Sequence, residues 1–369
     1  MKPRPFVALL VCAVLIGVYV VGLAERQSTA QLEPGKGDSS TSPKKLIPKT
    51  SFDGPALEFD FPSLRIGVAE YEEGPTGTTV FHFPKRVFAA VDVRGGAPGT
   101  LMTDGIRFGY DDNDAPRVDA ICFAGGSCYG LEAATGVMAE ILRVRGNSNK
   151  KEDIAYVPGA IVFDFNHRNN VIHPDKELGR AAFKAAKPGR FLLGPRGAGR
   201  FVHAGGYFGP EYRERSGQGG AFRQVGDTKI AVFTIVNSVG AIVDRQGKVV
   251  RGNRDPKSGK RTSIEDDLKT GKRAKSKTAP EGTRSPSANT TITLVVTNQR
   301  LSYLHLQRLA IQTHTSLNRA IQPFHTADDG DTLFAVTTGE VKNEKLSLRD
   351  LSTHAADLAW EAVLSSLAE

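Results

Sequence analysis

The sequence predicts an α/β protein, built as a layered sandwich with mixed sheets. Strand-like apolar runs alternate along the chain with segments whose apolar residues recur at helical spacing. Closely spaced strands separated by Gly/Pro turns, and a hairpin at 241–250, favour mixed sheets over a doubly wound parallel one. The chain has 369 residues, 39 of them glycine, and 24% are charged, which is typical of a globular protein and not of a disordered or fibrous one.

The expected elements follow from local patterns. The run 229–236 is almost continuously apolar and predicts a buried strand. Helical spacing of Leu131, Ala134, Val137 and Ile141 predicts a helix from about Tyr129. The other strands are expected at 65–71, 78–83, 87–93, from 118, 160–165, 241–243, 248–250, 290–297 and 331–338, and the other helices at 175–186, 302–320 and 350–367. The glycines at 125–126 match neither the dinucleotide fingerprint nor a P-loop, so no cofactor is expected.

The N-terminus predicts export. Lys2 and Arg4 precede an uninterrupted apolar run at 6–23, the pattern of an export signal whose length approaches that of a membrane-spanning helix. Cleavage after the signal and retention as a signal anchor (1–24) are both open, and either places the protein in the periplasm or outside the cell, in the second case attached to the membrane. A flexible stalk is expected at 25–57 and a single domain at 58–369.

The formal charge of +8 does not predict nucleic-acid binding. Much of the excess lies in 251–288, where basic residues are interleaved with Gly, Ser, Pro and Thr and no aromatic residue occurs, so a solvated basic linker is expected. Cys122 and Cys128 are expected to be two buried thiols, although export permits a disulfide. His167 and His173 are isolated, so no metal site is expected.

The junction Asn289-Thr290 is the most informative local feature. The polar, basic stretch ends there, and a β-rich run begins at a hydroxyl residue. If the chain cut itself at this bond, the new α-amino group, with a pKa of about 7.7–8.0, would lie beside the hydroxyl of Thr290. One residue would then supply both nucleophile and base. A loop entering a Thr-rich strand is the plainer interpretation.

Several motifs together resemble one family. They are 69–80, 91–97, 125–133, 217–223, 289–298 and 321–336. They resemble the DmpA/BapA group of self-processing L-aminopeptidases/D-esterases and β-aminopeptidases, and more closely the endo-type aminohexanoate-oligomer hydrolases, or nylonases. The resemblance covers roughly 58–367. It implies an αββα-type sandwich with mixed sheets, self-processed between Asn289 and Thr290 into two associated fragments, and an oligomer, often a tetramer in similar nylonases.

The resemblance also implies roles for individual residues. Thr290 would be the nucleophile, and Asp329 and Asp331 match two acidic positions of the site. Because positions 329 and 331 alternate, both carboxylates can face one side of the strand and hold the Thr290 ammonium. Asn237 would donate its amide to the developing oxyanion. The expected substrate is a small oligoamide or peptide, with no nucleic acid and no cofactor.

Two departures from the nylonase pattern concern catalysis. Tyr207 stands where nylonases have a lysine, and Phe163 where they have a tyrosine. Tyr207 brings a hydroxyl to the site that the resemblance implies, but a phenol does not replace a cation. Arg200, His203 and Tyr212 are candidates to compensate. Three functions stay open: a self-processing hydrolase of aminohexanoate oligomers or peptides, an exported aminopeptidase or β-aminopeptidase, and a non-catalytic member of the family.

Overall fold

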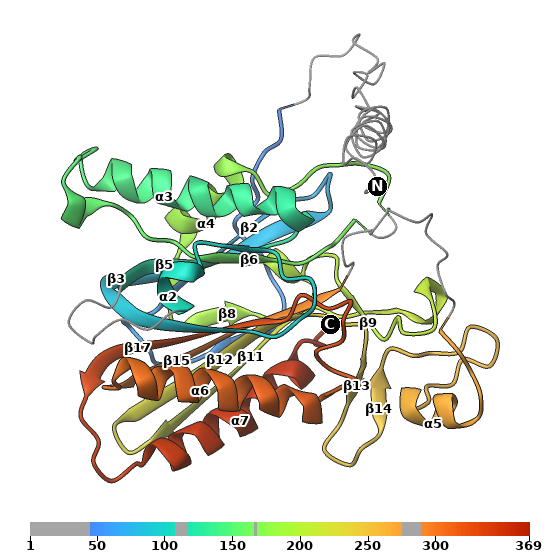
Figure 1. The fold of residues 1–369 in the computed structure, drawn as a ribbon. Coiled ribbons are helices and arrows are strands. Elements are labelled where there is room, and N and C mark those ends of the chain that lie inside the picture. Colours follow the sequence, from blue (N-terminus) through green and yellow to red (C-terminus); the bar gives the residue numbers. More distant parts are fainter. Residues whose placement is uncertain (1–44, 108–116, 166–167, 275–288) are drawn as a thin grey trace, which may run out of the picture. The chain divides into compact units, whose positions relative to one another are not determined.

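The computed structural model describes residues 45–107, 117–165, 168–274 and 289–369 (Figure 1). The predicted export segment and most of the stalk therefore lie outside the described residues. Within the described ranges, no helix has the length and apolar character needed to span a membrane. Residues 46–369 form one compact unit. Part of the predicted stalk belongs to this unit, because the backbone of Lys49 pairs with that of Glu70 at 2.9 Å in both directions.

The described chain contains the following elements. The strands are β1 (Ala56–Glu58), β2 (Arg65–Tyr71), β3 (Thr76–Val93), β4 (Thr100–Leu101), β5 (Arg117–Ala124), β6 (Gly159–Ile161), β7 (Lys187–Pro188), β8 (Arg190–Leu192), β9 (His203–Ala204), β10 (Glu214–Arg215), β11 (Gln218–Val225), β12 (Thr228–Asn237), β13 (Ala241–Val243), β14 (Val249–Arg251), β15 (Thr290–Gln299), β16 (Ile321–Gln322) and β17 (Thr332–Val341). The helices are α2 (Asp104–Arg107), α3 (Glu132–Val144), α4 (Lys176–Ala185), α5 (Ile264–Lys269), α6 (Tyr303–Ser316) and α7 (Leu348–Ser365).

The main sheet consists of two leaves, and β3 belongs to both. The first half of β3 pairs with β2 and β5 in one leaf, and its second half pairs with β17 in the other leaf. The strand order is therefore β11-β12-β15-β17-β3-β5-β6-β4. The sequence predicted two strands here, separated at Pro84. The structure instead shows one 18-residue strand whose register with β5 shifts between His82 and Val87. Pro84 is tolerated because it lies at this exposed irregularity, where the missing N–H breaks no ladder.

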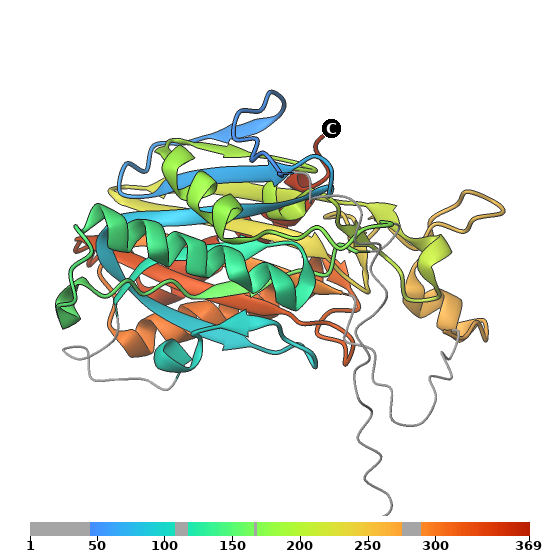
Figure 2. The same cartoon turned by 90° about the horizontal axis from the view of Figure 1, so that it is seen from above.

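Three apolar layers separate the helices and the two leaves. Phenylalanines dominate the layer between the leaves, where Phe81 contacts Phe123, Phe191 and Phe233 with ring centroids 5.2–6.2 Å apart. A second layer joins one leaf to α3 and α4, and a third joins the other leaf to α6 and α7. Figure 1 shows the helix pairs on opposite sides of the strands, and Figure 2 shows α3 and α4 lying over them. The predicted αββα sandwich with mixed sheets is confirmed.

Two glycines allow α3 and α4 to pack closely. A Cβ on Gly136 would lie 2.2 Å from the carbonyl oxygen of Lys176, and one on Gly179 would lie 2.0 Å from that of Ala133. Neither distance is tolerated by real side chains, so each helix approaches the other through a glycine. The cost of glycine within a helix is about 1 kcal/mol per residue, and the apolar burial between the two helices offsets it.

Two expectations were wrong in part. The basic linker was expected to be a solvated connector, but its described part contains α5. Ser263 accepts the N–H of Asp266 at the start of that helix, and Ile264 is buried below it. Of the two cysteines, Cys122 is a buried free thiol on β5, whereas Cys128 is a free thiol exposed at the surface, because it falls on the short helical turn before α3.

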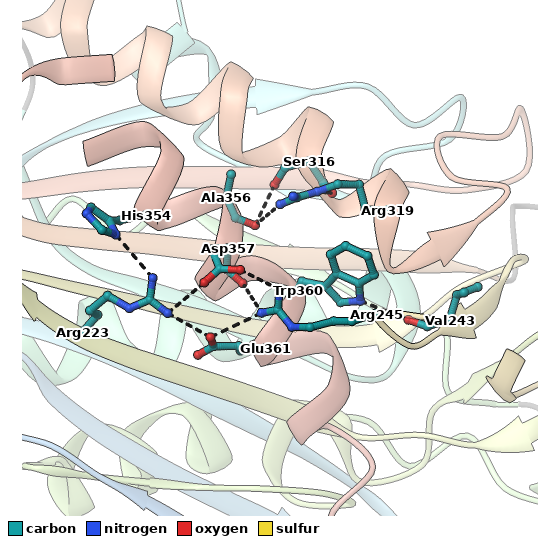
Figure 3. Close-up of polar contacts among 10 residues, drawn as sticks. All are labelled: Arg223, Val243, Arg245, Ser316, Arg319, His354, Ala356, Asp357, Trp360 and Glu361. Atoms are coloured by element: carbon teal, nitrogen blue, oxygen red, sulfur yellow. Dashed lines mark hydrogen bonds and ion pairs between the residues drawn. The ribbon is translucent and has the colours of Figure 1, made fainter. Parts of the chain in front are cut away.

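A polar network holds α7 against β11 and β13 (Figure 3). Arg223 donates to Asp357 and Glu361 at 2.8 and 2.9 Å, and Arg245 donates to the other oxygen of Asp357 at 2.7 Å. The indole N–H of Trp360 donates to the carbonyl oxygen of Val243 at 3.1 Å. The guanidinium groups of Arg245 and Arg319 lie 5.2 and 5.1 Å from the Trp360 ring, within cation–π range.

Candidate active site

Thr290 begins β15 in the interior of the sheet. It pairs with Asn237, the last residue of β12, and β17 runs parallel on the other side of the strand. A parallel bridge between Asn289 and Asp329 extends this pairing by one step before β15 begins. The Asn289-Thr290 bond is therefore fixed between two strands, and Thr290 is only 3% exposed.

The hydroxyl of Thr290 lies against the carbonyl group that precedes it. Thr290 Oγ1 donates to the carbonyl oxygen of Asn289 at 2.5 Å, and the backbone N–H of Gly330 donates to the same oxygen at 3.0 Å. A Cβ on Gly330 would lie 2.6 Å from Thr290 Oγ1, so only glycine leaves room for the hydroxyl here. A nucleophile and a backbone N–H that converge on one carbonyl group are the elements that acyl transfer requires.

Asp329 and Asp331 surround the backbone of the same junction. Asp329 accepts the N–H groups of Val239 and Thr326 at 3.1 and 3.2 Å and the Thr326 hydroxyl at 2.6 Å. Asp331 Oδ1 accepts the backbone N–H of Thr291 at 2.8 Å. Both carboxylates are buried. Burial, and next the negative charge of Asp331, raise the pKa of Asp329 to about 7.

The two aspartates and the Thr290 hydroxyl lie on opposite faces of the sheet. Ile292 belongs to the layer between the leaves, whereas Val295 and Leu333 belong to the layer that faces α6 and α7. By alternation along the strands, Thr290 faces the first layer and Asp331 the second. The backbone nitrogen of Thr290 lies between the two faces. The carboxylates thus lie on the face opposite the hydroxyl, where Asp331 contacts the backbone of Thr291.

The side chain of Asn237 bridges two segments beside Thr290. Its Oδ1 accepts the backbone N–H of His203 at 3.1 Å, and its Nδ2 donates to the carbonyl oxygen of Phe163 at 3.0 Å. In this uncut state the amide N–H that was expected to serve an oxyanion is bonded to Phe163. The Phe163 ring packs against Phe165, with centroids 5.6 Å apart.

Tyr207 is not part of the group around Thr290. It packs with Phe208, Ala241 and Ile264 in a small apolar cluster next to α5, and it lines a cavity of about 470 Å³ there. Among the described residues, no hydrogen bond or ring contact joins Tyr207 to Thr290 or to either aspartate. Of the other candidates, Tyr212 belongs to the same cluster, and Arg200 forms an ion pair with the buried Glu70 at 3.0 Å.

Sequence reasoning missed two histidines at the site. His325 donates from both its backbone nitrogen and Nδ1 to Asp331 Oδ2, each at 3.1 Å. The ring of His314, on α6, lies 4.4 Å from the His325 ring. His325 stands in a motif that was used for the family resemblance, six positions before Asp331, and this closeness was the available signal. The described residues contain no cluster of three His, Cys, Asp or Glu side chains suited to hold a metal ion.

Comparisons with known proteins show which proteins this chain is similar to. The chain is 43% identical over 331 residues to a 6-aminohexanoate-oligomer endohydrolase of Paenarthrobacter ureafaciens, covering 87% of this chain and 88% of that protein. It is 36% identical over 282 residues to an uncharacterized aminopeptidase of Mycobacterium leprae, covering 72% of each. The L-aminopeptidase D-Ala-esterase/amidase of Ochrobactrum anthropi, described as a variant of the Ntn hydrolase fold, superimposes with a TM-score of 0.57. It has 14% identity to this chain and covers 86% of it and 88% of its own length, so it shows the shared fold.

The family resemblance inferred from the motifs is confirmed. Residues 59–369 match peptidase family S58, and these residues include the Asn289-Thr290 junction, both aspartates and the two histidines. The chain is therefore a member of peptidase family S58 and an amide-bond hydrolase.

Proposed function

We propose that the chain cleaves itself between Asn289 and Thr290 and then hydrolyses amide bonds with Thr290 as an N-terminal nucleophile. The observation that carries this proposal is the contact between Thr290 Oγ1 and the carbonyl oxygen of Asn289, at 2.5 Å, together with the Gly330 N–H on the same oxygen. A structural threonine entering a strand has no need of the first contact, whereas the second is also the ladder bond of the bridge between Asn289 and Asp329.

The cut proceeds through an ester. Oγ1 attacks the carbonyl carbon of Asn289, and the oxyanion that forms keeps the hydrogen bond from Gly330. The C–N bond then breaks as the proton lost by the hydroxyl passes to the nitrogen of Thr290, which frees the α-amine and leaves Asn289 esterified to Oγ1. Water hydrolyses this ester and frees the hydroxyl of Thr290 and the carboxylate of Asn289. In turnover the amine takes the hydroxyl proton while Oγ1 attacks the substrate carbonyl, and water releases the acyl group.

We propose aminohexanoate oligomers or small peptides as the substrates. The support is the identity to the endohydrolase over 87% of the chain. The second candidate, an aminopeptidase, is supported by the similarity to the mycobacterial protein. Export through residues 1–24 belongs to the same proposal, and cell fractionation would test it. A full-length chain confined to the cytoplasm would exclude export.

Intact-mass analysis of the purified chain tests the self-cleavage. We expect two fragments divided between Asn289 and Thr290, a single uncut chain for Thr290→Ala, and slower cutting for Thr290→Ser, which keeps a hydroxyl. Linear aminohexanoate oligomers with a free or an acetylated amino end then separate the two activities. An endohydrolase cleaves both, whereas an aminopeptidase cleaves only the free form. A wild-type chain that stays whole and leaves both intact would refute the proposal.

A further inference from the structure

Asp331 is held on both oxygens by donors from two segments. Oδ1 accepts the N–H of Thr291 at 2.8 Å, and Oδ2 accepts the backbone N–H and the Nδ1 of His325, each at 3.1 Å. Because an ionised carboxylate only accepts, the proton on a neutral His325 ring must be on Nδ1. The Nε2 of the same ring is buried and has no hydrogen-bond partner among the residues that the structure describes.

The backbone of His325 is adapted to this double contact. Its φ is +58°, in the left-handed region that non-glycine residues seldom adopt and in which Asn, Asp and His are enriched. The conformation places the main-chain and side-chain donors of one residue on one carboxylate oxygen. A conformation that costs on the order of 1 kcal/mol persists where surrounding contacts require it, and such residues cluster at functional sites.

His314 supports the His325 ring from behind. It is fully buried, its ring is nearly perpendicular to that of His325 at 4.4 Å, and its Nδ1 lies 2.9 Å from Asp92 Oδ2. Asp92 also accepts from Arg94 at 2.7 Å. Burial lowers the pKa of His314, and this effect outweighs the hydrogen bond to Asp92, so the ring is neutral at neutral pH.

The charged and titratable groups on this side of the strand are therefore few. Asp331 faces His325 from the loop before β17, and the neutral His314 faces it from α6. Asp329 lies two residues before Asp331 in the chain. Asp92 and Arg94, at the end of β3, form an ion pair behind His314. The negative charge of Asp331 disfavours a second charge on Asp329.

We propose that His325, supported by His314, is a positioning residue that keeps Asp331 ionised and fixed on the Thr291 N–H, so that Asp329 carries the proton of the pair. This inference rests on the proposed function. It gives the freed Thr290 amine one neighbouring negative charge instead of two. One charge is enough to orient the amine, whereas two would hold it as an ammonium ion and deprive it of its role as base.

Two substitutions at His325 test its Nδ1 donor independently of its backbone conformation. His325→Gly accepts the positive φ but removes the Nδ1 donor. His325→Asn also accepts the positive φ, and its Nδ2, attached to Cγ like the Nδ1 of histidine, restores a donor. We expect the acid limb of the pH profile for oligomer hydrolysis by the cut chains to move up by about one pH unit in His325→Gly and to return in His325→Asn. A merely structural role would lower the rate at every pH without moving the limb.

A second measurement does not depend on catalysis. In chains that also carry Thr290→Ala, the denaturant midpoints of His325→Gly and His325→Asn are compared from pH 4 to pH 7. We expect the advantage of His325→Asn to grow with pH, because its donor stabilises the Asp331 anion. A constant difference would overturn the inference even if the wild-type chain cuts itself. Conversely, a wild-type chain that never cuts would refute the proposed function and leave this comparison as the test of His325.

Discussion

The backbone N–H of Gly330 donates to the carbonyl oxygen of Asn289 at 3.0 Å, across the bridge that joins the residues before β15 and β17. This contact places a donor on the carbonyl group that self-cleavage would attack, before any cut is made. The donor belongs to the backbone between Asp329 and Asp331, so the same three residues supply the oxyanion contact and both carboxylates.

Adding a methyl group at this position should slow self-cleavage. The Cβ of Gly330→Ala would lie 2.6 Å from Thr290 Oγ1 and from the carbonyl oxygen of Ala97, so the hydroxyl or the loop must move. We expect the rate constant for cutting, followed by intact mass, to fall about 100-fold. A thermal melt close to that of the Thr290→Ala chain would show that the fold is retained. Cutting at the wild-type rate would contradict the assigned role of the Gly330 N–H.

Asp329 should make the uncut chain less stable as the pH rises. Its pKa in the folded state, about 7, is above that of an unfolded aspartate, so the folded state binds the proton more tightly. The stability that this proton confers is complete below about pH 4 and is lost as the pH rises through 7. In the Thr290→Ala background we expect a loss of about 2 kcal/mol between pH 5 and pH 8 by urea unfolding.

Asp329→Asn should remove most of this dependence, because the amide does not titrate. The exposed neighbour Asp328 offers a matched control, and Asp328→Asn should leave the dependence in place. If the free energy of unfolding changed equally with pH in the Thr290→Ala chain and in both of these variants, another group would be responsible.

Tyr207 should contribute to packing and not to chemistry. It lies in the apolar cluster with Phe208 and Ile264, so Tyr207→Phe should cut itself within about twofold of the wild-type rate. Tyr207→Ala should cost about 2 kcal/mol of unfolding free energy, since it leaves a cavity in that cluster. A large loss of rate in Tyr207→Phe would show that the Tyr207 hydroxyl takes part in the chemistry, as the nylonase pattern implies.

The network on α7 should weaken at acid pH. Burial alone would raise the pKa of Asp357, but the hydrogen bonds from Arg223 and Arg245 outweigh it and lower the pKa. The stability that Asp357 contributes is therefore present above about pH 4 and is lost as the pH falls through its lowered pKa. We expect Arg223→Met to cost about 1 kcal/mol at pH 7, and less at pH 3, by urea unfolding. The exposed Arg308 provides a control, because Arg308→Met should change little at either pH.

Local patterns in the sequence were enough to locate most elements and part of the site. The strand 65–71 has the predicted bounds, and Asp329 and Asp331 both accept backbone N–H groups near the Asn289-Thr290 junction. Pairings across distant segments could not be inferred. His314 and Asp92 are 222 positions apart and meet only because α6 packs against the end of β3. Tyr207 was assigned by counting positions in a glycine-rich loop, and such counting does not show the direction in which a loop turns.

The strand order also determines what a cut at Asn289-Thr290 would leave behind. β15 and β17 would belong to the small C-terminal fragment, yet they lie between β12 and β3 of the large one. The pair β15 and β17 of one product would be inserted between β12 and β3 of the other, with a ladder of hydrogen bonds on either side. They could not separate without losing the sheet, and strands once separated would have to find each other again as two chains. After such a cut, unfolding of the enzyme would be difficult to reverse, because refolding would require two separate chains to associate.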